Sequence, residues 1–118
     1  MYTIKVEGGF SSAHNLREYK GKCEGLHGHN WRVEARIRSA KLDSIGMVVD
    51  FKDVKAYLNA VLEELDHQYL NDLGPFKKTN PTSENIAAYI YGRLKQRFPE
   101  LAAVTVWENA TSAATYEE

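Results

Sequence analysis

The feature that most constrains the fold of this chain is a strict alternation over residues 31–38. Trp31, Val33, Ala35 and Ile37 alternate with Arg32, Glu34, Arg36 and Arg38. Because successive side chains of a strand point to opposite faces, this pattern predicts a strand with one apolar face and one charged face. The charged face is too polar for a dry core, so it contacts either water or a wet interface between subunits. The pattern alone leaves both alternatives open.

Three further segments also predict strands. Residues 2–10 alternate in the same way, and the Gly8-Gly9 pair predicts a bulge that redirects the residues after it. Residues 101–107 contain the β-favouring Val104, Val106 and Trp107, and residues 111–116 can form a last short strand.

Two helices are predicted between these strands. Apolar residues recur at spacings of three and four from Phe51 to Leu65, and Asp50 is expected to cap that helix. Thr82 or Ser83 can cap a second helix, which ends at Phe98-Pro99. The order of two strands, two helices and two strands predicts an α+β fold. In it, a four-stranded antiparallel sheet carries both helices on one face.

The bulk properties narrow the class of protein. A length of 118 residues and a hydrophobic content of 43% are typical of one soluble domain spanning residues 1–118. The net charge of −1 argues against binding to nucleic acid or an anionic membrane. The sequence contains neither an apolar run of the roughly 18 residues that a membrane span needs nor a secretory signal, so we expect a cytoplasmic location.

The histidines carry the first indication of chemistry. His27 and His29 flank Gly28, and on a strand their side chains project from the same face, which suits two ligands of one metal ion. The alternative is a glycine-rich turn with incidental histidines. His14 is a candidate third ligand from a neighbouring strand. Three nitrogen ligands with an open fourth position are typical of catalytic zinc.

Cys23 is the only cysteine, so it cannot form an internal disulfide and is either a buried or a reactive thiol. Beside a metal it would be either a fourth ligand or a general base whose pKa the cation lowers. Asp66 precedes His67 and could raise the basicity of that histidine, provided that the two side chains meet. The alternative is that His67 interacts with the last carbonyls of the preceding helix.

Residues 15–25 contain Arg17, Lys20 and Lys22 and are expected to form a loop. The loop either covers the site or is simply solvated. Because the chain has almost no net charge, an anionic substrate would have to be held by a local cluster of this kind.

Taken together, these residues resemble one family. His14, Cys23, His27-Gly28-His29, Asp66-His67, the Pro81-Thr82-Ser83-Glu84-Asn85 stretch and Glu108 resemble, in this order, the 6-pyruvoyl-tetrahydropterin synthase and 6-carboxy-tetrahydropterin synthase family. The resemblance implies the ββααββ tunnelling fold, in which three subunits close a β-barrel and two trimers stack into a homo-hexamer. The charged face of residues 32–38 would then line the barrel.

The resemblance also implies a site. Zinc would be bound by His14, His27 and His29. Cys23 would be the general base, with Asp66 and His67 as a proton relay. Glu108 would anchor the pterin ring, and Thr82, Ser83 and Glu84 would complete the pocket.

The implied substrate is 7,8-dihydroneopterin triphosphate, and the favoured product is 6-carboxy-5,6,7,8-tetrahydropterin, which is used in queuosine synthesis. The assignment of Arg17, Lys20 and Lys22 to the triphosphate is our own.

Two positions depart from the family pattern. Asn15 stands where many members have arginine, which leaves the phosphate contact open. Glu24 follows Cys23, and a subgroup that releases 6-hydroxymethyl-7,8-dihydropterin for folate synthesis uses a glutamate near this position as acid or base. A lyase of that kind and a 6-pyruvoyl-tetrahydropterin synthase are therefore the alternatives. A non-catalytic protein that binds zinc or pterin is a more remote one.

Overall fold

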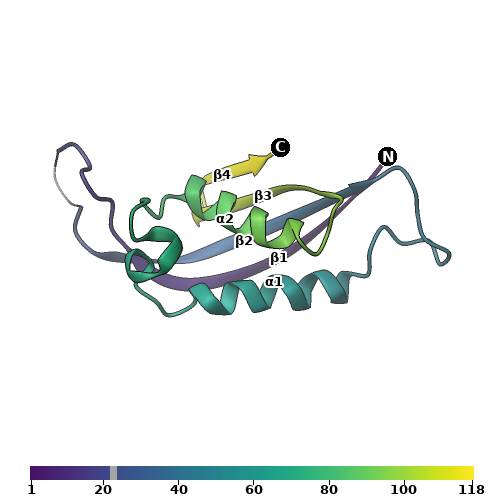
Figure 1. Cartoon of the computed structure of the whole chain (residues 1–118), viewed down its shortest axis with the longest axis horizontal. Coiled ribbons are helices and arrows are strands. Elements are labelled where there is room, and N and C mark those ends of the chain that lie inside the picture. Colours follow the sequence, from purple (N-terminus) through teal and green to yellow (C-terminus); the bar gives the residue numbers. More distant parts are fainter. Residues whose placement is uncertain (22–23) are drawn as a thin grey trace.

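The computed structural model describes residues 1–21 and 24–118. Its strands form one antiparallel sheet in the order β1-β2-β3-β4 (Figure 1). The strands are β1 (Tyr2–His14), β2 (His27–Ser39), β3 (Leu101–Asn109) and β4 (Ser112–Glu117). This confirms the predicted four-stranded antiparallel sheet.

Two α-helices, α1 (Phe51–Leu65) and α2 (Ser83–Lys95), lie between β2 and β3 in the chain. Two short 3-10 helices, η1 (Leu70–Asp72) and η2 (Gly74–Phe76), separate them. The helix α1 packs on β1, whereas α2 packs on β3 and β4. Among the described residues, no helix has the length and apolar character needed to cross a membrane.

The core lies between the helices and one face of the sheet. On β2 it takes Trp31, Val33, Ala35 and Ile37, all at most 2% exposed. Across the same face come Val104 and Val106 of β3, and the helices contribute their own buried stripes. The predicted apolar core face of residues 31–38 is therefore confirmed.

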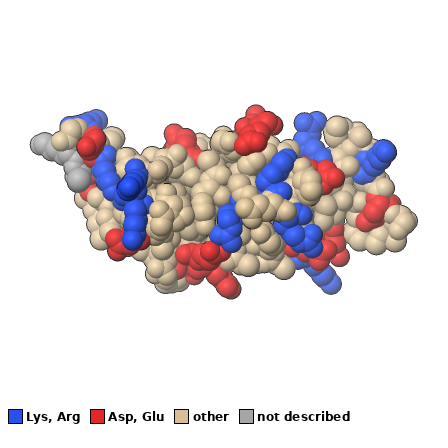
Figure 2. Space-filling model, in the orientation of Figure 1, with Lys and Arg blue, Asp and Glu red and all other residues tan. Residues whose placement is uncertain are grey.

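The opposite face of the sheet is polar. Arg32 and Arg38 are exposed, but Glu34 is only 6% exposed and accepts a hydrogen bond of 3.1 Å from Arg36. Figure 2 shows acidic and basic side chains interspersed over one side of the molecule, in keeping with the small net charge.

Both helices begin with a side-chain cap. The Asp50 carboxylate accepts from the backbone N–H of Lys52, which confirms the predicted cap of α1. The hydroxyl of Thr82 accepts from the N–H of Asn85 at the start of α2. Of the two residues that the sequence offers for this second cap, Thr82 is the one used.

The bulge predicted at Gly8-Gly9 is wrong, because β1 pairs with β2 from Tyr2 to His14 without a register shift. The glycines instead permit close approach. A Cβ on Gly8 would lie 2.8 Å from Leu62 Cδ1 of α1, and one on Gly9 would lie 2.9 Å from the carbonyl oxygen of Trp31. Gly8 therefore lets α1 pack closely on the sheet, and β1 continues to His14 without a break in its pairing with β2.

Candidate functional site

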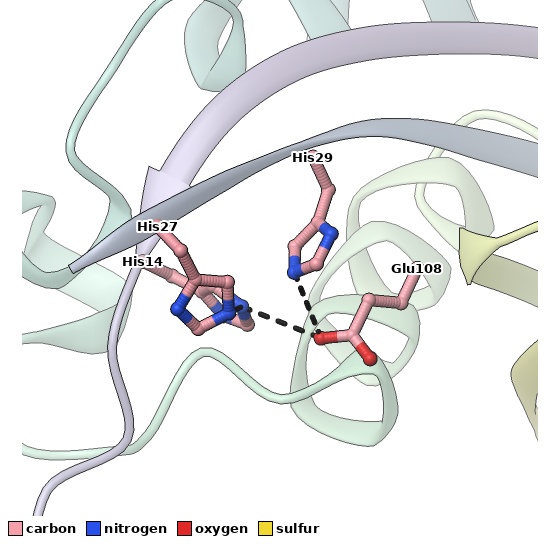
Figure 3. Close-up of side chains that lie close together, drawn as sticks. All are labelled: His14, His27, His29 and Glu108. Carbon is pink, nitrogen blue, oxygen red and sulfur yellow. Dashed lines mark hydrogen bonds and ion pairs between the residues drawn. The ribbon is translucent and has the colours of Figure 1, made fainter. Parts of the chain in front are cut away.

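Three histidines and one glutamate meet at one end of the core. His14 ends β1 and pairs in register with His27, the first residue of β2, while His29 lies opposite Ser12. Glu108 comes from β3, near its end. One ligand atom from each of these four residues lies within 4.8 Å of the other three (Figure 3). We call this group the His–Glu cluster.

Hydrogen bonds to backbone carbonyls orient two of the imidazoles. Nδ1 of His14 donates to the carbonyl of Pro81 at 2.8 Å, and Nδ1 of His27 donates to that of Gly25 at 2.9 Å. Because a carbonyl oxygen can only accept, both rings present an unprotonated Nε2 in their neutral form. These two Nε2 atoms lie 3.0 Å apart. Facing lone pairs at this distance are satisfied by a cation between them.

The other two members complete the arrangement. His29 Nε2 is buried and has no hydrogen-bond partner among the described residues. Oε1 of Glu108 lies 3.2 Å from His29 Nε2 and 3.4 Å from His14 Nε2. Burial lowers the pKa of His29. The Glu108 carboxylate raises this pKa, whereas the neighbouring His14 and His27 lower it further. A neutral imidazole is the form that binds a metal, so the cluster fits a zinc-type site with nitrogen and oxygen ligands.

Trp31 packs its buried indole against the His–Glu cluster. Its indole is 2% exposed, and the rings of His14 and His29 meet it edge to face, with centroids 4.9 and 5.1 Å away. Its Nε1 donates to the carbonyl of Ser12 at 3.2 Å. The indole therefore restricts two of the three imidazoles to a narrow range of orientations.

A pocket of about 350 Å³ opens beside the cluster, and we call it the site pocket. It is lined by His14, Leu16, Tyr19, Glu24, Thr82, Ser83, Glu84 and Glu108. The structure thus brings the predicted substrate-binding residues and Glu24 to one cavity. Leu16 and Tyr19 could not be predicted as pocket residues, because an apolar or aromatic residue in a loop carries no pattern that marks it as part of a site.

Asp66 and His67 interact with each other but do not line the site pocket. Asp66 Oδ2 lies 2.8 Å from His67 Nδ1, and its Oδ1 accepts from the N–H of Ser11 at 2.8 Å. The Ser11 N–H, followed by the His67 ring, lowers the pKa of Asp66. The side chain of His67 is 81% exposed. Within one chain, this pair therefore faces solvent at the outer edge of β1.

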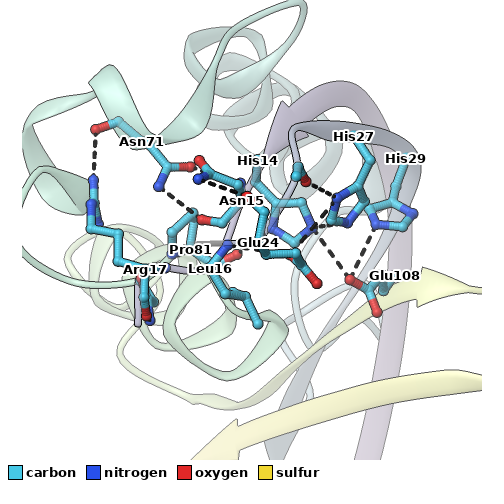
Figure 4. Close-up of polar contacts among 12 residues, drawn as sticks. His14, Asn15, Leu16, Arg17, Glu24, His27, His29, Asn71, Pro81 and Glu108 are labelled. Atoms are coloured by element: carbon cyan, nitrogen blue, oxygen red, sulfur yellow. Dashed lines mark hydrogen bonds and ion pairs between the residues drawn. The ribbon is translucent and has the colours of Figure 1, made fainter. Parts of the chain in front are cut away.

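Of the basic residues in the loop 15–25 that are predicted to bind the triphosphate, Arg17 and Lys20 lie in different surroundings. The Arg17 guanidinium donates to the backbone carbonyl of Asn71 at 3.1 Å (Figure 4). It also donates to the carbonyls of Phe76 at 2.7 Å and Thr79 at 3.3 Å. The guanidinium of Arg17, one of the three groups predicted to bind the triphosphate, is therefore engaged in bonds within the protein. The second of these residues, Lys20, is exposed to solvent. The other two predicted residues of this region, Lys22 and Cys23, lie outside the described residues.

Glu24 reaches both the loop and the cluster. Its Oε1 accepts from the N–H of Leu16 at 3.2 Å and lies 3.7 Å from Nδ1 of His27 (Figure 4). The carboxylate is therefore at the site pocket, as an acid or base would have to be, and it also makes a structural contact.

Comparison with known proteins agrees with this geometry. The family model described as 6-pyruvoyl tetrahydropterin synthase matches residues 3–118. A 6-carboxy-5,6,7,8-tetrahydropterin synthase of Synechocystis is 43% identical, over 98% of this chain and 93% of that protein. The protein of the same name from Haemophilus influenzae is 30% identical, over 100% of both chains.

Solved structures give the same result. The 6-pyruvoyl tetrahydropterin synthase of Caenorhabditis elegans superimposes with a TM-score of 0.87 at 30% identity, covering 99% of this chain and 95% of that one. A catalytic-residue mutant of the Plasmodium vivax enzyme has a TM-score of 0.81 over 99% of this chain and 97% of that one. At 22% identity, that likeness shows the fold alone. With the family model covering nearly the whole sequence, the chain belongs to the 6-pyruvoyl tetrahydropterin synthase family.

Proposed function

We propose that this protein is a zinc-dependent lyase that converts 7,8-dihydroneopterin triphosphate to 6-carboxy-5,6,7,8-tetrahydropterin. The observation that carries the proposal is the convergence of three imidazoles and Glu108 beside the site pocket. The names of the Synechocystis and Haemophilus relatives favour the carboxy product over the pyruvoyl one. In this proposal the whole chain is one domain, the location is cytoplasmic, and the product serves queuosine synthesis.

His14, His27 and His29 would hold the zinc through Nε2, since the Nδ1 atoms of His14 and His27 already donate to carbonyls. The bound zinc would act as a Lewis acid on a side-chain hydroxyl or carbonyl of the substrate. Glu108 would pair with the pterin, because a carboxylate can accept from the 2-amino group and N3–H together. Its 33% exposed side chain is accessible from the site pocket for this purpose.

Proton transfer is assigned to Cys23, with Asp66 and His67 as the relay. Asp66 holds Nδ1 of His67, which leaves Nε2 of that ring free to exchange a proton. Since this pair faces outward from its own chain, we propose that it acts at the site pocket of a neighbouring subunit. This fits a homo-hexamer of two trimeric barrels, in which the polar sheet face lines the barrel.

The second candidate is a lyase that releases 6-hydroxymethyl-7,8-dihydropterin for folate synthesis. One observation favours it specifically, namely that the Glu24 carboxylate lines the site pocket next to His27. In this alternative Glu24 takes the role of acid or base that we assign to Cys23.

Matched variants separate the two candidates. The zinc-loaded protein is incubated with 7,8-dihydroneopterin triphosphate, and the products are identified by chromatography and mass spectrometry. We expect Cys23→Ala to abolish the 6-carboxy product and Glu24→Gln to retain it, because the Gln carboxamide oxygen can still accept from Leu16. Loss of a hydroxymethyl product in Glu24→Gln alone would favour the folate-type lyase.

The alternative of a non-catalytic protein is tested by the reactivity of the Cys23 thiol. If the protein only bound zinc or pterin, Cys23 would ligate the metal permanently or be dispensable. Thiol titration of the zinc-loaded protein checks this, since a general base should react readily with a thiol reagent.

A further inference from the structure

The backbone of residues 15–17 connects the metal ligands to the wall of the site pocket. It follows His14 directly, and Leu16 lines the pocket beside that histidine. The segment belongs to none of the strands, so the sheet does not hold it. Its position must therefore be fixed by contacts of another kind.

Two asparagine side chains hold one edge of this segment, and Figure 4 shows the first of them, Asn71. The carboxamide of Asn71 accepts from the N–H of Asn15 at 3.1 Å and donates to the carbonyl of the same residue at 2.8 Å. The carboxamide of Asn80 does the same for Arg17, accepting from its N–H at 2.8 Å and donating to its carbonyl at 3.1 Å. Each carboxamide thus forms the pair of bonds that a residue of a neighbouring strand would form.

The opposite edge is held by Glu24. Its N–H donates to the carbonyl of Leu16 at 2.8 Å, and its side-chain Oε1 accepts from the Leu16 N–H at 3.2 Å. Backbone groups of successive extended residues point to alternate sides, so Asn15 and Arg17 bond on one side and Leu16 on the other. All backbone polar groups of the three residues are satisfied, as buried or ligand-facing backbone requires.

The same asparagines lie close to the other parts of the site. Asn71 is 5% exposed, so its carboxamide is buried rather than competing with water. Asn80 precedes Pro81, whose carbonyl orients His14, and the carbonyl of Asn80 accepts from the side chain of Asn85 on α2 at 2.8 Å. A shift of residue 80 would therefore move the His14 partner and the pocket wall together.

We propose that Asn71 and Asn80 are positioning residues. Their carboxamides hydrogen-bond to the backbone of residues 15–17 and so fix His14 and the part of the site pocket that Leu16 lines. Among the described residues, the hydrogen bonds of both carboxamides go to residues 15 and 17 rather than to the His–Glu cluster, so both asparagines act through the segment they hold. The inference rests on the proposed function for its catalytic consequence only, because its effect on metal binding needs no substrate.

The test compares Asn71→Leu and Asn80→Leu, which remove both bonds at similar volume, with Gln96→Leu. Gln96 is an exposed amide at the far end of α2 and serves as the matched control. For each zinc-loaded protein, the rate of zinc release to a chelator is measured, followed by KM and kcat. We expect both variants to release zinc about tenfold faster than the control, as changes behind a metal ligand typically do. We expect KM to rise about tenfold and kcat to change less in protein that retains its zinc, because the displaced Leu16 wall weakens binding of the ground state and of the transition state alike.

The two asparagines hold the same segment, so the double variant should show less than the sum of the single effects. Asn80 is partly exposed, and its variant decides the question if Asn71→Leu does not fold. Zinc release and KM equal to those of Gln96→Leu in the folded variants would overturn the proposal. A wild type that holds zinc but makes no product would contradict the proposed function. The rates of zinc release would still decide whether Asn71 and Asn80 position the zinc site.

Discussion

His14 and Pro81 are 67 residues apart in the sequence, yet Nδ1 of the histidine donates to the proline carbonyl at 2.8 Å. The bond fixes both the tautomer and the direction of the imidazole, which the sequence cannot show. It also joins the end of β1 to the residue before the cap of α2. Two elements that are distant in the chain thereby define one metal-binding geometry.

The first prediction concerns metal binding. His27→Ala removes a direct nitrogen ligand of the proposed zinc. It should therefore lower zinc affinity by more than about 100-fold, the largest loss that typically follows from changing a residue that only supports a ligand. The measurement is a competition titration with a chromogenic chelator. His67→Ala is the control, because His67 is outside the cluster and should leave the zinc content unchanged. Equal losses in the two variants would refute the assignment of the ligands.

The second prediction concerns the indole below the cluster. Trp31→Phe leaves a small cavity and removes the bond to Ser12, and should cost about 1–3 kcal/mol of unfolding free energy. The comparison is Trp107→Phe on the other face of the sheet, where the ring is partly exposed and stacks with Arg32 at 3.9 Å. That change should cost less than about 1 kcal/mol. Urea unfolding measures both, and the reverse order would contradict the position given to Trp31.

The third prediction uses the two helix caps. Asp50→Ala and Thr82→Ala each remove one side-chain cap and should each cost about 1 kcal/mol of stability. Only Thr82→Ala should also reduce kcat/KM, because the start of α2 lines the site pocket and that of α1 does not. Thermal unfolding and steady-state kinetics of both variants check this. Equal losses of activity would show that the effect follows stability rather than the pocket.

The fourth prediction concerns pH. The folded pKa of Asp66 lies below its ordinary value of 3.8, chiefly because the Ser11 N–H stabilises the carboxylate. The resulting stabilisation is present above pH 3.8 and is lost as the pH falls through the lower folded pKa.

Asp66→Asn keeps an acceptor for Ser11 but does not titrate. The stability advantage of the wild type over this variant should therefore shrink as the pH falls below 3.8 and through the lower folded pKa of Asp66. Urea unfolding at several pH values measures it. An advantage that grew toward low pH would contradict the assigned cause.

The sheet and helices could be predicted because their signals are local. The alternation of residues 31–38, the spacing of apolar residues in α1 and the Asp50 cap each depend on neighbours in the sequence. Gly8 shows the limit of such reasoning. A glycine pair in a strand suggests a bulge, but the contact that explains Gly8 comes from Leu62 on α1.

The site was predictable in composition rather than in arrangement. Three histidines in a metal-binding pattern mark the cluster, and they do lie together. The family resemblance implies only a pterin contact for Glu108, whereas its carboxylate also lies within 3.4 Å of two imidazoles. The roles of Asn71 and Asn80 could not be predicted, because an asparagine between two helices is ordinary until its backbone partners are known.

The central claim is tested most directly by the product that the wild-type protein forms. Protein with one zinc per chain is incubated with 7,8-dihydroneopterin triphosphate, and the pterins are separated and identified by mass. The proposed function predicts 6-carboxy-5,6,7,8-tetrahydropterin as the main product. No turnover at full zinc occupancy, or 6-hydroxymethyl-7,8-dihydropterin as the sole product, would contradict it.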